Sequence, residues 1–263
     1  IYTCFSRMKG DYPRRWFPRF TISILPARKL PPAEGRTPRV RRRVQAERLR
    51  RMMQEAVVVS RRRGALWPAL LRAANLHGRR RVVLEDAREQ PETYGRLIRN
   101  ALALGRMVST LTEEGERVGV LMPNLTTTVG LFYGMWTVRR IPAILNFSAG
   151  LEAMQAACRL ARVRVVLTSR AFLERARLTE TAARLQDVRL VYLEDLRDSF
   201  GLGGKLWVLA ASLFPRAAAL PSGPDDPAAI LFTSGSEGVP KGVVLSQSSI
   251  LANIDQFDAV IEF

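Results

Sequence analysis

Short apolar runs alternate with stretches of helical periodicity from Arg81 to the end of the chain. The apolar-rich runs are each bounded by turn residues: RRVVLED, ERVGVLMPN, IPAILNF, VRVVLTS, VRLVYLED and PAAILFTSG. Between them, stretches such as YGRLIRNALALGRMVSTL and LEAMQAACRLARV repeat apolar positions at helical spacing. This alternation predicts an α/β fold with a largely parallel sheet.

Before Arg81 the pattern is different. In RFTISILPA, Phe20, Ile22 and Ile24 alternate with polar residues, which predicts a strand with one buried face that ends at Pro26. The next segment, RKLPPAEGRTP, has the proline and glycine content of a linker. We therefore expect one folded segment to end before this linker.

A basic amphipathic helix is predicted after the linker. RVRRRVQAERLRRMMQEAVVVSRRR, residues 39–63, carries arginine on the sides of an apolar stripe made by Val40, Val44, Leu49, Met52, Met53, Ala56 and Val57. The following GALWPALLRAANLHGRRR adds a second apolar patch that arginines border. That patch consists of Trp67, Leu70, Leu71 and Leu76.

Two interpretations of this basic region stay open. An indole among arginines suits a membrane interface, where it lies at the depth of the anionic headgroups. The candidate residues for such a surface are Arg41, Arg42, Arg43, Arg61, Arg62, Arg63 and Trp67. The alternative is a helix that packs on a neighbouring domain and keeps a solvated arginine face. Nucleic acid is the least favoured partner, because neither interleaved aromatic residues nor a helix-turn-helix pattern accompanies the arginines.

Two apolar segments raise the question of a membrane span. No charged residue occurs from Val118 to Val138, but this run contains Pro123, Asn124, four threonines and interior glycines. A spanning helix needs about 20 mostly apolar residues, so we predict a buried strand, a loop and a buried helix instead. KLWVLAASLFP, residues 205–215, is too short to span. It is either a core helix or a helix that lies in an interface.

The excess of positive charge is confined to one part of the 263-residue chain. The net charge is +17. Residues 1–80 contain 21 Lys and Arg against 4 Asp and Glu, whereas residues 81–263 contain 20 of each.

Cys4 and Cys158 match neither a metal-ligand spacing nor a redox pair, which favours a reducing compartment. The chain begins at Ile1 without the pattern of a signal peptide, as if within a domain.

The strongest chemical signal follows the last predicted strand. TSGSEGVPKG, residues 233–242, begins at the carboxyl end of AAILF, which is where open α/β sheets bind ligands. Backbone N–H groups of a glycine-rich turn form an anion cradle, and hydroxyls and an ammonium add donors. The candidate phosphate-binding residues are Thr233, Ser234, Gly235, Ser236, Glu237, Gly238 and Lys241.

Two alternatives to this assignment exist. The segment is not the P-loop of nucleotide triphosphatases, because Lys241 follows Pro240 and Gly242 occupies the position of the required Ser or Thr. A Ser/Gly-rich surface loop without a ligand is the other alternative. The particular order of its residues disfavours it.

The loop resembles the signature of a known superfamily. TSGSEGVPKGVV is similar to the phosphate-binding motif of the adenylate-forming superfamily of acyl synthetases, firefly luciferases and peptide-synthetase adenylation domains. Seven further segments resemble, in the same order, one bifunctional family within it, the 2-acylglycerophosphoethanolamine acyltransferase/acyl-[acyl-carrier-protein] synthetases of bacterial inner membranes. These segments are FSRMKG, RRWFPRFTISILP, GERVGVLMPN, RRIPAILNFSAG, VVLTSRAFLE, VYLEDL and SSILANIDQF.

The resemblance implies a domain organisation. Residues 1–30 would be the tail of a glycerophospholipid acyltransferase domain, residues 31–80 a basic helical linker, and residues 81–263 the N-terminal part of an AMP-binding synthetase domain. It also implies a location at the cytoplasmic face of the bacterial inner membrane.

The resemblance also implies an activity. The synthetase half activates a fatty acid with ATP and Mg²⁺ as acyl-AMP and passes the acyl group to acyl carrier protein. The acyltransferase half then acylates a lysophospholipid, lysophosphatidylethanolamine. On this reading the chain is a fragment that is inactive alone. The rival hypotheses are a fragment of a long-chain fatty acid–CoA ligase and a non-catalytic protein that binds ATP or anionic lipid.

The chain departs from the pattern of the family at several positions. His77 is the only histidine and lies five positions before Val82 rather than before an Asp, so we expect a linker residue and not a catalytic base. Leu245 and Gln247 occupy positions where histidines are expected in close relatives. The later motifs of the family and any catalytic residue are expected outside these 263 residues.

Overall fold

The computed structural model describes residues 24, 26–27, 29, 31–32, 37–60, 64–86, 91–234 and 240–260. The chain divides into two compact units, Ile1–Arg63 and Gly64–Phe263, each described by itself below. In the first unit, the predicted basic helix is confirmed as α1 (Pro38–Ser60). Thr37 caps it by accepting a hydrogen bond from the Val40 N–H at 3.3 Å. Of the strand predicted at Phe20, Ile22 and Ile24, only Ile24 is described, and it is 92% exposed and not part of a strand. The arginines Arg61, Arg62 and Arg63 lie outside the described residues.

The second unit begins before the boundary that the sequence predicts. Its first helix is α2 (Leu66–His77), which buries Trp67, Leu70 and Leu71 in a core shared with α3. α2 therefore belongs to the compact unit that begins at Gly64, whereas the sequence places the start of the synthetase part at Arg81. The reason is that the apolar stripe of α2 needs a hydrophobic neighbour, and the apolar face of α3 supplies it.

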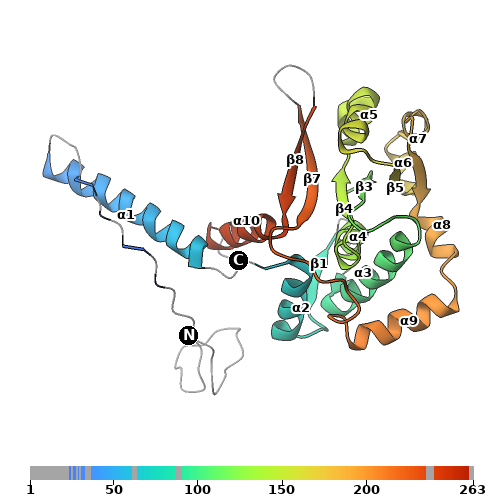
Figure 1. Ribbon diagram of the computed structural model, residues 1–263, viewed down its shortest axis with the longest axis horizontal. Coiled ribbons are helices and arrows are strands. Elements are labelled where there is room, and N and C mark those ends of the chain that lie inside the picture. Colours follow the sequence, from blue (N-terminus) through green and yellow to red (C-terminus); the bar gives the residue numbers. More distant parts are fainter. Residues whose placement is uncertain are drawn as a thin grey trace. The chain divides into compact units, whose positions relative to one another are not determined.

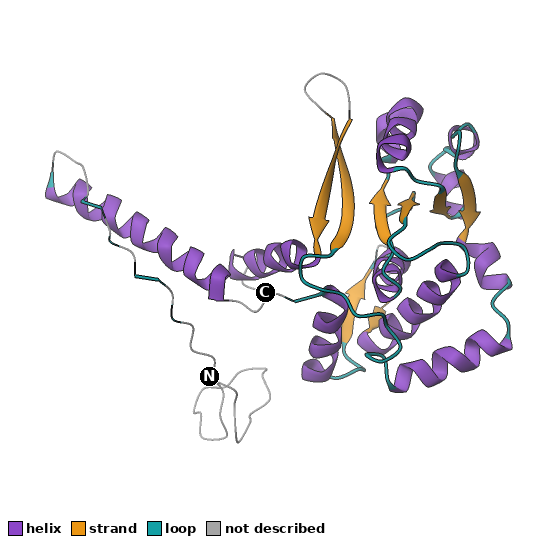
Figure 2. Cartoon of the chain, viewed as in Figure 1, coloured by secondary structure: helices purple, strands orange, loops and turns teal. Residues whose placement is uncertain are grey.

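A six-stranded sheet forms the centre of the second unit, in the order β6-β5-β3-β4-β7-β8. All neighbouring strands are parallel except β7 and β8, which are antiparallel. The strands are β3 (Arg117–Val120), β4 (Ile141–Ile144), β5 (Val165–Thr168), β6 (Arg189–Tyr192), β7 (Pro227–Ser234) and β8 (Pro240–Ser246). The predicted α/β fold with a largely parallel sheet is confirmed (Figures 1 and 2).

One predicted strand does not join this sheet. The run RRVVLED forms β1 (Val82–Glu85), which pairs antiparallel with β2 (Pro91–Thr93) in a separate two-stranded sheet. The residues of β1 are half-buried or exposed. A strand of a parallel sheet between two helical layers would be buried on both faces, as β5 is.

Helices cover both faces of the main sheet. On one face α3 (Tyr94–Ser109), α4 (Thr126–Thr137) and α8 (Leu193–Asp198) enclose a core around Val118, Leu131 and Leu167. On the other face α5 (Gly150–Ala161) encloses a core around Met154, Cys158 and Val166, with the shorter α6 (Arg170–Arg175) and α7 (Thr179–Ala183) beside it. A 3₁₀ turn, η1 (Phe147–Ala149), leads from β4 into α5.

The uncharged run from Val118 to Val138 folds as predicted. It forms β3, a loop and the buried helix α4. Among the described residues, no helix has both the length and the apolar character to cross a bilayer.

The segment around KLWVLAASLFP forms α9 (Leu202–Leu213). One side packs on α3, where Trp207 lies under the Arg106 guanidinium, 4.6 Å from the centre of the ring. Arg79 donates a hydrogen bond to the Ser212 carbonyl at 2.9 Å and holds the last turn. The opposite side of α9 is exposed.

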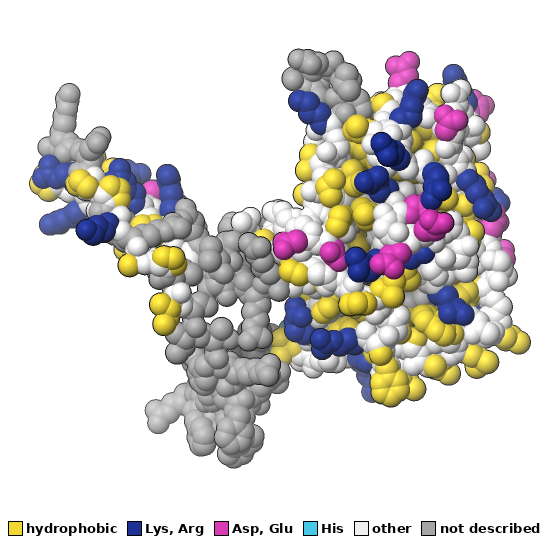
Figure 3. Space-filling model, in the orientation of Figure 1, with side chains coloured by type: hydrophobic (Ala, Val, Ile, Leu, Met, Phe, Trp, Pro, Cys, Tyr) yellow, Lys and Arg dark blue, Asp and Glu magenta, His cyan; other side chains and the backbone are white. Residues whose placement is uncertain are grey.

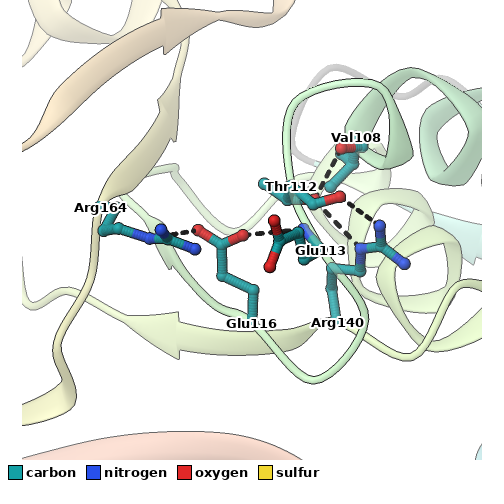
Figure 4. Close-up of polar contacts among 6 residues, drawn as sticks. All are labelled: Val108, Thr112, Glu113, Glu116, Arg140 and Arg164. Atoms are coloured by element: carbon teal, nitrogen blue, oxygen red, sulfur yellow. Dashed lines mark hydrogen bonds and ion pairs between the residues drawn. The ribbon is translucent and has the colours of Figure 1, made fainter.

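A buried arginine fastens the amino-terminal edge of the sheet (Figure 4). Arg140 is 7% exposed, and its Nε donates to Thr112 Oγ1 at 3.1 Å. The other guanidinium nitrogens donate to the carbonyls of Thr112 and Val138. Burial lowers the pKa of Arg140, an effect that nearby glutamates partly offset. The contacts tie the loop after α3 to the turn before β4.

Candidate phosphate-binding site

The strand that leads into the predicted phosphate loop, β7, is buried at its start, and its end pairs only with β8. Ala228, Ala229 and Ile230 of β7 are buried. The Trp136 indole of α4 donates to the Ala228 carbonyl at 2.7 Å. β7 pairs with β4 only as far as Leu231. Its remaining residues pair with β8 alone, so the β7–β8 hairpin extends beyond the carboxyl edge of the sheet (Figure 1).

Thr233 and Lys241 are direct partners on the two strands of this hairpin. Directly opposed residues place their side chains on the same face, with Cβ atoms about 5 Å apart. Both side chains are exposed. The structure therefore brings together one hydroxyl donor and one ammonium where the hairpin leaves the sheet.

The remaining predicted residues of the loop are not tested by the structure. Gly235, Ser236, Glu237 and Gly238 lie outside the described residues, and only the backbone of Ser234 is described. Ser234 pairs with Pro240 in the last register position of the hairpin. Both ends of the five-residue connection 235–239 are thus fixed by the strands, and Thr233 and Lys241 lie one pair below it.

The base of the hairpin is fastened by Gln247, a residue that departs from the pattern of the family. Its side chain is 2% exposed, and Oε1 accepts a hydrogen bond from the Leu66 N–H at 3.0 Å. Its own N–H donates to the Asp226 carbonyl at 3.0 Å. Gln247 begins α10 (Gln247–Val260) and satisfies an N–H group at the start of α2, where no side chain of α2 provides a cap. The structure thus gives Gln247 a structural role.

A second polar cluster lies at the carboxyl ends of β5 and β6. Ser169 donates to Glu194 Oε1 at 2.7 Å, and Arg170 forms a bidentate pair with Asp195 at 2.6 and 2.7 Å. The Arg170 guanidinium also lies 4.1 Å from the centre of the Tyr192 ring. The sequence analysis missed this cluster, because its members come from two segments whose proximity depends on the β5–β6 pairing.

The environment of these acids lowers their pKa values. The hydrogen bond and charge of Arg170 lower the pKa of Asp195. Burial acts to raise the pKa of Glu194, but hydrogen bonds from Ser169 and from neighbouring backbone groups outweigh it, and the net pKa is lowered. Both carboxylates are therefore held in the charged form at neutral pH.

The assignment of Trp67 to a membrane interface is wrong. Trp67 is 4% exposed, and its Nε1 donates to the Pro215 carbonyl at 3.1 Å. Its ring packs against Tyr133 with centroids 6.5 Å apart. α2 packs on helices of its own unit, whereas the alternative from the sequence was a helix that packs on a neighbouring domain. Arg41, Arg42 and Arg43 are exposed on α1, and their proposed contact with an anionic surface stays a prediction.

His77 lies in the last turn of α2 and therefore inside the second unit, which corrects its assignment to a linker. Its ring stacks on Tyr94 with centroids 6.2 Å apart and an interplanar angle of 8°. Within the part of the chain that the structure describes, no group of three or more His, Cys, Asp or Glu side chains is placed to hold a metal ion.

The architecture and the hairpin define a class of protein. A parallel sheet between helical layers, with an exposed hydroxyl and ammonium at the carboxyl end of a strand, is typical of α/β proteins that bind phosphate groups. The family model for AMP-binding enzymes matches residues 70–262. The chain belongs to this family, and its second unit is the N-terminal part of an adenylate-forming domain.

Similar proteins agree with this membership. The sulfoacetate–CoA ligase of Cupriavidus necator is 30% identical over an alignment of 181 residues that covers 61% of this chain and 30% of the ligase. The crystal structure of VinN superposes with a TM-score of 0.63 at 22% identity and covers 77% of this chain and 51% of VinN. A fatty acyl-adenylate ligase from L. pneumophila, in complex with acyl adenylate and pyrophosphate, gives a TM-score of 0.54 at 21% identity and covers 74% of this chain and 32% of the ligase.

The chain spans about half or less of the length of these similar proteins. Family membership shows that residues 70–262 are part of an AMP-binding domain, and enzymes of this family in general use ATP and Mg²⁺. The likeness to these solved structures shows that the chain shares their fold.

Proposed function

We propose that the chain is part of an enzyme that activates a fatty acid with ATP and passes the acyl group to the phosphopantetheine thiol of acyl carrier protein. The observation that carries this proposal is the Thr233–Lys241 pair, which lies at the carboxyl end of β7 within the signature that resembles acyl synthetases. The order of the segments that resemble the bifunctional family supports the further step, acylation of a lysophospholipid by a second domain.

The exposed pair suits a polyphosphate. The Lys241 ammonium supplies a positive charge and the Thr233 hydroxyl a hydrogen-bond donor, and both lie on one face of the hairpin. Backbone N–H groups of the connection 235–239 would add an anion cradle above them. Mg²⁺, when bound, shields phosphate charge and orients the leaving pyrophosphate.

The reaction places specific demands on these groups. The carboxylate of the fatty acid attacks the α-phosphorus of ATP, an acyl–phosphate bond forms, and the bond to the β-phosphate breaks to release pyrophosphate. Negative charge therefore grows on the leaving group. Lys241 and Thr233 would stabilise that charge and hold the β- and γ-phosphates in line, so their contribution is positioning and electrostatics.

ATP–pyrophosphate exchange tests this proposal. The native protein is captured from detergent extracts of its source cells with an antibody against residues 36–63 and is incubated with labelled pyrophosphate. Palmitate, sulfoacetate and an amino acid mixture are compared as substrates. We expect exchange with palmitate. Exchange with sulfoacetate or amino acids alone would assign a different acid substrate, and no exchange with any acid would leave a non-catalytic ATP-binding protein.

The acceptor is tested in the same preparation. Holo-acyl carrier protein and coenzyme A are supplied separately with labelled palmitate and ATP, and a lysophosphatidylethanolamine arm follows the second transfer. The proposal predicts acyl-carrier-protein loading and labelled phosphatidylethanolamine. Palmitoyl-CoA as the only product would instead assign a long-chain fatty acid–CoA ligase.

A further inference from the structure

The exposed side of α9 is a continuous apolar stripe. We define the α9 leucine face as the five large apolar side chains on this side, which are between 64% and 78% exposed: Leu202, Leu206, Leu209, Leu213 and Phe214. The four leucines follow one another at spacings of four, three and four residues and therefore lie along one line of the helix. Contiguous exposed apolar patches mark interaction surfaces, whereas single exposed leucines do not.

The inward side of α9 already has its own partners. Ala211 and Ser212 are buried, and Trp207 packs into the core that α2 and α3 share. Arg106 covers the Trp207 ring, and Arg79 holds the Ser212 carbonyl. The orientation of α9 is thus fixed by these contacts, and the leucine face points outward as a consequence.

The charges beside the leucine face are all positive on this segment. Between Asp198 and Asp225 the sequence contains no acidic residue, and its charged residues are Lys205 and Arg216. Both are exposed. An apolar stripe with only basic side chains next to it is complementary to an anionic interface that has an apolar interior.

A hollow next to the end of α9 joins apolar and basic groups. Its volume is about 410 Å³, and its lining includes Leu213 and Phe214 together with Arg72, Arg79 and Arg216. Guanidinium groups bind phosphate oxygens through paired N–H donors. Figure 3 shows hydrophobic side chains along the lower right edge of the second unit, where α9 lies in Figure 1, with basic side chains near them.

We propose that α9 lies flat on an anionic lipid bilayer, with the leucine face below the headgroups and Arg72 and Arg216 on the lipid phosphates. A helix of 12 residues is about 18 Å long, so it can lie in the interface but cannot span it. The β7–β8 hairpin lies at the opposite end of the second unit (Figure 1). The phosphate-binding end therefore stays open to water, and this inference goes beyond the proposed activity and does not depend on it.

Vesicle flotation of the 263-residue chain tests the proposal. Vesicles of phosphatidylglycerol and phosphatidylcholine are compared with phosphatidylcholine alone, at low salt and at about 1 M salt, where the screening length is about 3 Å. The basic helix α1 can bind anionic vesicles through charge alone, but high salt suppresses that binding. Lipid association that persists at high salt therefore reports burial of apolar side chains.

Two variants distinguish lipid binding through α9 from lipid binding through other parts of the surface. Leu206→Glu/Leu209→Glu introduces two charges into the leucine face, and we expect its partition into phosphatidylglycerol vesicles at high salt to fall at least about tenfold. Leu160→Glu is the matched control, because Leu160 is 54% exposed on α5, and its partition should equal that of the unmodified chain. Circular dichroism confirms that each variant is folded.

Equal flotation of the three proteins at high salt would overturn the proposal. A dye attached to Leu209→Cys and quenched by bromines on the lipid chains would support it, and quenching of a dye at Leu160→Cys instead would contradict it. Loss of self-association in the double variant, without vesicle binding by the unmodified chain, would assign the leucine face to a second copy of the chain.

Discussion

Gly105 on α3 and Gly134 on α4 meet where the two helices cross. A Cβ atom added at Gly105 would lie 2.5 Å from the Gly134 carbonyl oxygen and 2.5 Å from Thr137 Oγ1. A Cβ atom added at Gly134 would lie 2.6 Å from the Ala101 carbonyl oxygen. At both sites the close contacts include a backbone carbonyl oxygen, which cannot move aside as a flexible side chain could. The close crossing sets how α3 and α4 cover one face of the sheet.

Gly105→Ala and Gly134→Ala should each destabilise the fold by about 1–3 kcal/mol, because the helices must separate to admit the methyl group. Gly130→Ala is the matched control on α4, where the nearest atom to the new methyl group would be Leu104 Cδ1, at an ordinary contact distance of 3.6 Å. Helix propensity predicts that this control is neutral or more stable by up to about 1 kcal/mol. Urea midpoints measure all three, and equal midpoints for Gly105→Ala and Gly130→Ala would contradict the close crossing.

Arg140→Met should lower the free energy of unfolding by about 2–3 kcal/mol. The substitution leaves the carbonyls of Thr112 and Val138 without the guanidinium donors that now satisfy them. Arg50→Ala is the control, because Arg50 pairs with Glu47 at 2.7 Å with side chains that are 63% and 45% exposed, and such exposed ion pairs contribute little. Thermal and urea unfolding of the two variants should rank them in this order, and the reverse order would refute the role given to Arg140.

Acid should destabilise the chain partly through Glu194. Its pKa in the folded chain is below the ordinary value of 4.5, so the charged form favours folding. This contribution to the free energy of unfolding is complete above pH 4.5 and is lost as the pH falls through the pKa of Glu194 in the folded chain. Glu194→Gln should therefore flatten the acid side of the stability profile relative to the unmodified chain. An acid limb that keeps its slope in Glu194→Gln would count against the Ser169–Glu194 contact.

Cys158 should not react with thiol reagents in the folded chain. It is 2% exposed within the core beneath α5, and burial raises the pKa of its thiol to about 11. In a Cys4→Ser background, modification should follow the urea unfolding curve. Rapid modification in the absence of denaturant would show that α5 does not cover this face of the sheet as described.

The sequence predicted the layered fold because buried strands and amphipathic helices leave distinct periodic patterns. It placed β3 and α4 correctly within the uncharged run from Val118 to Val138. The partner of β1 and the antiparallel β8 were not anticipated, because their pairing depends on neighbours distant in sequence. The role of Trp67 was misjudged for a similar reason. Its core is completed by α3, which follows it in the chain.

The candidate site was predictable in its motif but not in its surroundings. The order of residues around Lys241 was enough to predict phosphate binding, whereas its cross-strand partnership with Thr233 follows from the register of the hairpin. Gln247 illustrates the difference. Gln247 occupies a position where a histidine is expected in close relatives. Its side chain accepts a buried hydrogen bond from the Leu66 N–H, 181 positions earlier in the chain.

The central claim is that the β7–β8 hairpin binds the phosphates of ATP. Titration calorimetry of the 263-residue chain measures the affinity for ATP and for pyrophosphate directly. The test variants are Lys241→Ala and Thr233→Val. The control variant is Lys205→Ala, which removes an exposed lysine on α9. Loss of a hydrogen bond to a charged group costs about 1.5–3 kcal/mol, so Lys241→Ala should weaken both ligands at least about tenfold while Lys205→Ala binds as the unmodified chain does. Equal affinity of Lys241→Ala and the unmodified chain would contradict the claim.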